Sequence, residues 1–184
     1  MDTLETARLR LRPFSLEDVE NYYLGISSDA DVMRYLPGGK PRQRSDAQWV
    51  VSYFMRHAEL HGFGIWAVEE KASRRLIGHA GLEYIPGSEE VEIAYTLAKA
   101  YWGRGYATEA ATEAIKFGFE AVNLAEIYGL AFLPNTASQK VMQKIGMESL
   151  GTTDRYYGEL LACYRLTRDQ YLAVHEEGSL SSDQ

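Results

Sequence analysis

The sequence predicts a mixed α/β domain built on a mostly antiparallel sheet. Three runs of strand-forming residues, 63–69, 76–85 and 91–97, follow one another with only short turns between them, which favours an antiparallel meander. The third run is followed by a helical stretch over 107–121 and by another strand-like run over 127–132. This strand–helix–strand order predicts one β-α-β unit, and therefore one parallel strand pair, inside the antiparallel order.

The N-terminal region reads as a strand and a helix. Residues 8–12 alternate arginine and leucine at period two, and the proline that follows ends the strand they predict. Ser15, with Asp18 three residues later, fits a capping box and predicts a helix that runs to about Ile26. The proline- and glycine-rich segment 37–41 then predicts a loop.

A second helix is expected to begin at Ser45, because Gln48 completes a capping pattern there. Trp49, Tyr53 and Phe54 lie at helical spacing on it. We expect these aromatic residues to be mostly core, with one edge of the helix lining a pocket.

The helix that follows the third strand presents a stripe of small residues, which allows close packing on a sheet. Its members are Ala107, Ala110, Ala111, Ala114 and Gly118. Asn135 is a good N-cap for a further helix that ends at Gly146, and a last strand is expected over 160–166.

Composition and length predict one domain, at residues 1–175, with a flexible polar tail over 176–184. The net charge of −7 argues against a nucleic-acid partner and favours cationic amines. No apolar run approaches the ~20 residues that span a bilayer. The single Cys163 cannot form an internal disulfide and the N-terminus has no apolar signal segment, so a reducing cytoplasm is the expected compartment.

Residues 101–110, Tyr-Trp-Gly-Arg-Gly-Tyr-Ala-Thr-Glu-Ala, form a glycine-rich turn between a strand and the alanine-rich helix. Such a turn directs backbone N–H groups to one point at the start of the helix, where a phosphate can bind. Gly103 and Gly105 lack the Cβ that would block a close approach. Taken alone, the pattern also fits a tight turn that binds nothing.

Three pieces of the chain carry a family resemblance. They are residues 91–97 with the glycine turn, residues 6–18 with 31–36, and residues 134–147. In this order they resemble the acetyl-CoA-binding core, the N-terminal strand and first helices, and the last core helix of GCN5-related N-acetyltransferases (GNAT). The branch they resemble includes the ribosomal-protein alanine acetyltransferases. The resemblance implies a twisted sheet with helices on both faces and a splayed parallel strand pair.

The same resemblance implies a function and a set of cofactor-binding residues. Acetyl-CoA would be the co-substrate, and its acetyl group would pass directly to a primary amine, either a protein N-terminal α-amine or a small-molecule amine. The pyrophosphate would lie on the glycine turn and the pantetheine arm along the third strand, with backbone N–H near Leu97 stabilising the oxyanion. The family often has Gln or Arg where this chain has Trp102. The expected cofactor-binding residues are Tyr95, Thr96, Leu97, Trp102, Gly103, Arg104, Gly105, Tyr106, Ala107, Thr108, Asn135 and Ser138.

Two carboxylates are the candidates for acid–base chemistry on an amine. The turn over 86–89 centres a hairpin whose simplest register sets Glu83 opposite Glu92, with Leu82 against Ile93 on the other face. Facing carboxylates raise one another's pKa, which suits a general base that acts directly or through water. The alternative is that both are solvated or are paired with an arginine of the first strand.

The group that assists the departing thiolate is less defined. Many relatives carry a tyrosine in the middle of the last core helix, and the matching position here is Met142. Ser138 is a catalytic candidate for this role, and a tyrosine from another segment or helix-terminal N–H groups are alternatives. Asn135 and Ser138 also fit plain helix capping. The missing tyrosine supports a second hypothesis, a non-catalytic acyl-CoA-binding module.

The enzyme is expected to be a monomer or a homodimer.

Other polar residues carry weaker signals. The four histidines have no metal-ligand spacing with one another or with Cys163, so no metal site is expected. Cys163 lies in an apolar run and is expected to be a small core residue. The basic residues Lys40, Arg42 and Arg44 are candidates for contact with the coenzyme's 3′-phosphate or for a substrate lid.

Overall fold

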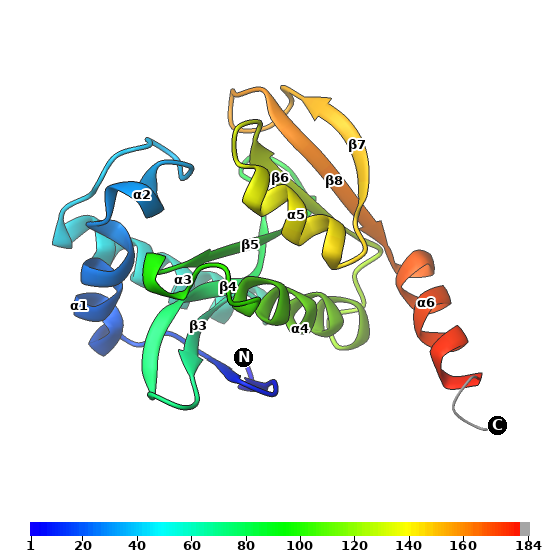
Figure 1. Ribbon diagram of the computed structural model, residues 1–184, viewed down its shortest axis with the longest axis horizontal. Coiled ribbons are helices and arrows are strands. Elements are labelled where there is room, and N and C mark those ends of the chain that lie inside the picture. Colours follow the sequence, from blue (N-terminus) through cyan, green and yellow to red (C-terminus); the bar gives the residue numbers. More distant parts are fainter. Residues whose placement is uncertain (181–184) are drawn as a thin grey trace.

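The computed structural model describes residues 1–180 and contains one eight-stranded sheet in the order β1-β2-β3-β4-β5-β6-β8-β7 (Figure 1). All neighbours are antiparallel except β5 and β6, which are parallel. The predicted mixed α/β class with one parallel strand pair is therefore confirmed. The strands are β1 Leu4–Glu5, β2 Leu9–Arg12, β3 Ile65–Glu70, β4 Arg75–Tyr84, β5 Val91–Leu97, β6 Glu126–Phe132, β7 Glu148–Thr153 and β8 Leu161–Thr167.

Helices cover both faces of the sheet, as the family resemblance implies. In β3, Ile65 and Ala67 pack into a cluster with α1 and α3, whereas Trp66 and Val68 pack into a second cluster with α4. This division follows from the alternation of side chains along a strand. The helices are α1 Val19–Tyr22, α2 Ala30–Met33, α3 Arg44–His61, α4 Tyr106–Glu120, α5 Thr136–Lys144 and α6 Arg168–Leu180.

The small-residue stripe of α4 performs the predicted close packing. Ala110, Ala111 and Ala114 are fully buried. A Cβ added at Gly118 would lie 2.6 Å from Cδ1 of Leu82 on β4, so any larger residue would force that side chain to move. The helix therefore sits directly on the strands that lead into the glycine turn.

The hairpin of β4 and β5 has the predicted register. Glu83 pairs with Glu92 and Leu82 with Ile93, and pairing continues to Leu97. On its other side β5 pairs with β6 at one position, Glu92 opposite Tyr128. The two parallel strands therefore separate beyond Glu92, which confirms the splayed pair.

Several local predictions were wrong. The helix α3 begins at Arg44, because Gln43 is its N-cap and the Asp46 carboxylate accepts the backbone N–H of Gln43 at 2.9 Å. The first helix is broken into a short 3₁₀ turn, α1 and a wider π-type turn over Tyr23–Ser27. The sequence did not predict the edge strand β7, whose residues are mostly exposed, or α6.

The predicted C-terminal tail begins inside α6, which continues to Leu180. Its last part, residues 181–184, lies outside the described residues. Within the described part of the chain, no helix is long and apolar enough to cross a membrane.

Candidate active site

A cavity of about 580 Å³ opens where β5 and β6 separate. The cavity is lined by β4, β5, β6, α3 and the start of α5. The chain on either side of α2 and the segment that precedes β8 complete its walls. The polar side chains that line it include Arg42, Glu83, Glu92, Tyr95, Asn135 and Ser138. The structure thus brings together both predicted carboxylates and both predicted polar residues of α5.

Glu92 is the buried acid of this cavity, with 6% of its surface exposed. Burial raises its pKa to about 7, and the charge of Glu83 adds a smaller increase. The Tyr157 hydroxyl donates a hydrogen bond to Oε1 of Glu92, which opposes the increase. The pKa of Glu92 is therefore raised mainly by burial and to a smaller extent by Glu83, whereas Glu92 is not among the causes of the shift of Glu83.

Glu83 faces the same cavity and is half-buried. The hydroxyl of Tyr53, on α3, donates to its Oε2 at 3.1 Å, and burial raises the pKa of this carboxyl as well. The alternative in which an arginine of the first strand pairs with these acids is wrong, because Arg12 pairs with Asp18 and Glu69 instead. Full solvation is excluded for Glu92 by its burial.

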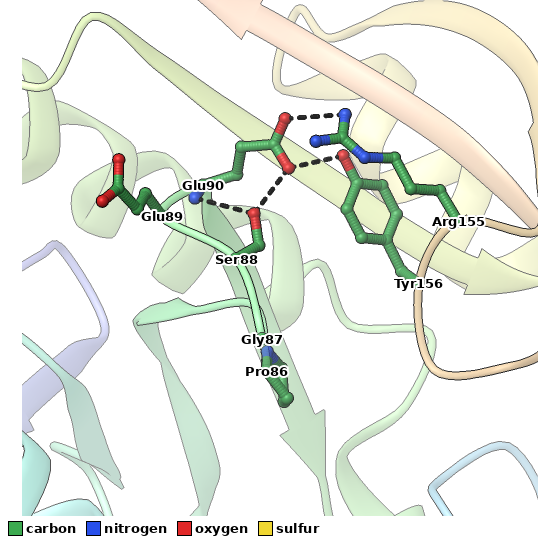
Figure 2. A pocket seen from close by; sticks show the side chains of 7 residues that line it. All are labelled: Pro86, Gly87, Ser88, Glu89, Glu90, Arg155 and Tyr156. Atoms are coloured by element: carbon green, nitrogen blue, oxygen red, sulfur yellow. Dashed lines mark hydrogen bonds and ion pairs between the residues drawn. The ribbon is translucent and has the colours of Figure 1, made fainter.

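Tyr157 is a site residue that the sequence did not single out. It lies in the segment between β7 and β8. Its backbone φ is 57°, a value that residues other than glycine rarely adopt. The neighbouring residues hold this segment onto the β4–β5 turn. Glu90 accepts hydrogen bonds from Ser88 and Tyr156, both at 2.7 Å, and pairs with Arg155 at 3.0 Å (Figure 2).

Figure 2 shows that these four side chains meet at the rim of a second pocket of about 440 Å³, while Glu89 points away from Arg155 and Tyr156. The Glu90 contacts join two loops that are distant in sequence. Because Tyr157 directly follows Arg155 and Tyr156, these contacts help to position its hydroxyl at Glu92.

Three polar groups line the cavity on the α5 side. The hydroxyl of Tyr95 lies 2.9 Å from Oγ of Ser138 and donates to the Ser138 carbonyl at 2.9 Å. Burial raises the pKa of Tyr95 to about 12, so the phenol stays protonated at neutral pH. Asn135 caps α5, and its Oδ1 accepts the N–H of Ser138 at 3.2 Å. Met142, at the position where relatives carry tyrosine, is 1% exposed and belongs to the core against Gly129.

The glycine turn lies beyond the other end of β5. Gly103 and Gly105 have φ values of 73° and 79°, which glycine tolerates best, and α4 begins directly afterwards at Tyr106. The turn is fastened from outside, because Arg8 donates to the Arg104 carbonyl at 2.9 Å. The first backbone N–H groups of α4 have no acceptor within the helix, so they can donate hydrogen bonds to a phosphate.

The side chains of the turn have structural contacts of their own. The Trp102 indole donates to the Leu97 carbonyl at 2.7 Å. The Tyr106 hydroxyl donates to Glu70 at 2.6 Å, and the Arg104 guanidinium lies over the ring of Tyr101. Ala107 and Thr108 are half-buried in the first turn of α4.

The other candidates have clear surroundings. Cys163 is buried in β8, as expected of a core residue. Phe54 is core, whereas Trp49 is 67% exposed and stacks on Tyr53 at the cavity, so this edge of α3 lines a pocket as the sequence predicted. Among the described residues, no group of three metal-ligating side chains is arranged around a common point.

Comparison with known proteins gives the class of the molecule. Residues 8–148 match the model of the acetyltransferase (GNAT) domain. An Aspergillus fumigatus protein named FsC-acetyl coenzyme A-N(2)-transacetylase is 30% identical over an alignment of 192 residues, gaps included, that covers 95% of this chain and 80% of the relative. A GNAT-family acetyltransferase from Bacillus anthracis has a TM-score of 0.78 at 28% identity, and the match covers 91% of this chain and 99% of that one.

The chain therefore belongs to the GNAT acetyltransferase family and is an N-acetyltransferase. The family resemblance seen in the sequence is confirmed. A structure of RimL, the ribosomal L7/L12 α-N-protein acetyltransferase, in complex with coenzyme A also matches, with a TM-score of 0.78 at 13% identity over 92% of this chain and 99% of that one. At this identity the similarity to that branch is one of fold.

Proposed function

We propose that this protein transfers the acetyl group of acetyl-CoA to a primary amine bound in the 580 Å³ cavity, with Glu92 as the general base. The observation that carries the proposal is the position of Glu92, a buried carboxylate at the point where β5 and β6 separate. A pKa of about 7 lets this group accept a proton from an ammonium ion near neutral pH, directly or through a water molecule.

The coenzyme is assigned to the gap between the two parallel strands. Its pyrophosphate would meet the glycine turn over 103–108, and its pantetheine arm would lie along the free edge of β5 at residues 95–97, like an added strand. The amide nitrogen of Asn135 makes no hydrogen bond to a described residue, so it can donate to the arm. Backbone N–H near Leu97 is available as the oxyanion donor in this arrangement.

Proton movement follows from this placement. The acceptor ammonium loses its proton to Glu92, and the free amine attacks the thioester carbonyl to form a tetrahedral oxyanion. Collapse breaks the carbon–sulfur bond, and the second proton of the attacking nitrogen passes through water to the leaving sulfur, so that a neutral amide and the free coenzyme A thiol are formed. Ser138, held by the protonated Tyr95 at 2.9 Å, supplies a hydrogen bond to the departing thiolate. This pair takes the place of the tyrosine that is absent at Met142.

The net charge of −7 and the free Cys163 support action on cationic amines in a reducing cytoplasm, without a nucleic-acid partner. The relative from Aspergillus, whose name specifies acetyl coenzyme A, supports the identity of the donor.

A thiol-release assay with a panel of amines tests the proposal. Wild type is expected to release coenzyme A thiol in the presence of a suitable amine, and Glu92→Gln to lose ~10²- to 10⁴-fold in turnover with unchanged acetyl-CoA affinity. Glu89→Gln, an exposed glutamate of the same hairpin, is the matched control and should keep full rate. Silence of the wild type over a broad panel, with normal coenzyme binding, would favour the non-catalytic acyl-CoA-binding module.

A further inference from the structure

Arg42 stands apart from the other arginines of its segment. Its backbone N–H donates to the Ser27 carbonyl at 2.7 Å and its Nη2 donates to the Pro37 carbonyl at 2.7 Å, so both ends of the residue are anchored. Arg34 and Arg44, close to it in sequence, each pair with a carboxylate. Arg42 has no ion pair with any residue that the structure describes, and it lines the cavity.

Arg42 is half-buried as a residue and has no counter-ion among the described residues, so its guanidinium can take an anion. Removing a charge from water costs free energy unless it is paired, and the planar guanidinium matches the geometry of carboxylate and phosphate oxygens. One of the Arg42 donors is used by the Pro37 carbonyl. The remaining donors are available to a ligand in the cavity.

The cationic and anionic groups of the cavity come from different elements. Arg42 belongs to the segment between α2 and α3, which Figure 1 shows at the left of the view, and the β7–β8 loop that carries Tyr157 lies at the top. Burial raises the pKa of Tyr22, a further lining residue, and the charges of Arg42 and Glu83 act on it in opposite directions. The charge of Arg42 is not among the influences on the pKa of Glu92. The cavity therefore carries a cationic group as well as the two carboxylates.

We propose that the acceptor is a primary amine that also carries an oxyanion, a carboxylate or a phosphate, with the oxyanion on Arg42 and the amine facing Glu92. This inference rests on the proposed function and names its substrate class. The stacked rings of Trp49 and Tyr53 line the same cavity and offer an apolar surface to the acceptor. Free amino acids and small amino phosphates fit this description, whereas polyamines offer nothing to Arg42.

The test compares acceptors that differ in the anionic group alone. Amino acids, their carboxamides, 2-aminoethyl phosphate and spermidine are assayed for kcat/KM by thiol release with wild type, Arg42→Gln and Arg44→Gln. We expect wild type to prefer the oxyanion-bearing acceptors over the carboxamides. Arg42→Gln should lose ~10- to 100-fold on those acceptors and little on the carboxamides, because one charge-assisted contact is removed. Arg44→Gln, which loses only an exposed pair with Glu20, should match wild type.

Two further readouts separate the possible failures. Binding of each acceptor to the coenzyme-saturated protein is measured by calorimetry, so that Arg42 is tested even if no amine is acetylated. Absence of acetylation together with normal acceptor binding would overturn the proposed function but not the role of Arg42. Affinities for coenzyme A and 3′-dephospho-coenzyme A are measured with both variants. An Arg42→Gln defect confined to the 3′-phosphate form would assign Arg42 to the coenzyme and overturn the inference. An equal loss on all acceptors, or an unchanged preference, would overturn it too.

Discussion

Replacement of Glu92 by glutamine is expected to lower activity and raise stability at alkaline pH. The folded protein raises the pKa of Glu92 from 4.5 to about 7, so it holds a proton there that the unfolded chain releases. The contribution of Glu92 to the free energy of unfolding therefore falls as the pH rises from 4.5 through 7, and it reaches its lowest value above pH 7. A shift of this size corresponds to about 3 kcal/mol, which Glu92→Gln should recover because its amide does not ionise.

The measurement is the thermal midpoint of wild type, Glu92→Gln and Glu89→Gln at several pH values between 4.5 and 8.5. For a chain of this length, about 3 kcal/mol corresponds to roughly 6–12 °C. The difference in Tm between Glu92→Gln and wild type should grow across this range. The Glu89→Gln difference should stay flat, since that carboxylate is exposed.

Activity supplies the second half of the same experiment. The kcat/KM of wild type should rise with pH through about 7 as Glu92 loses its proton, and Glu92→Gln should flatten this acidic limb. A Tm difference that does not change with pH would refute the burial argument. A fully active variant with an intact acidic limb would return Glu92 to a structural role and make Glu83 the next residue to test.

Three other substitutions probe separate parts of the site. Tyr157→Phe removes the hydrogen bond that lowers the pKa of Glu92, so the acidic limb of kcat/KM should move to higher pH; an unmoved limb would detach Tyr157 from the base. Gly103→Val should weaken coenzyme A binding about tenfold or more by calorimetry. Gly62→Val, at a similar φ of 75° in the α3 cap, controls for backbone strain, and equal affinities in the two variants would remove the cradle assignment. Ser138→Ala should slow transfer without loss of coenzyme affinity, and an unchanged rate in stopped-flow thiol release would leave Ser138 a capping residue only.

The parts of the fold that follow local rules were predictable from the sequence. The β4–β5 register follows from a short turn and from alternation, which together leave one pairing that buries Leu82 and Ile93 on the same face. The stripe of small residues on α4 gave its packing face. Edge strand β7 was missed because its exposed residues show no inward and outward alternation.

The partners of the site carboxylates were not predictable. Tyr53 is 30 positions from Glu83 and Tyr157 is 65 positions from Glu92, and no local pattern connects residues at such separations. The spacing of Trp49, Tyr53 and Phe54 predicted a pocket-lining edge on α3, but it could not tell which of the three is exposed there. Only the packed arrangement of loops decides these contacts.

The chemical character of Glu92 is a consequence of topology. β5 pairs with β4 along its whole length, but with β6 only where Glu92 faces Tyr128. At this last shared position the backbone is flanked by strands on both sides, while the side chain leaves the sheet toward the cavity, where the Tyr157 hydroxyl contacts it. A shift of the separation point by one residue would bring Ile93 there, on the opposite face of the strand. The end of the parallel pairing thus places a buried carboxylate beside the opening and leaves the next stretch of β5 free for a ligand.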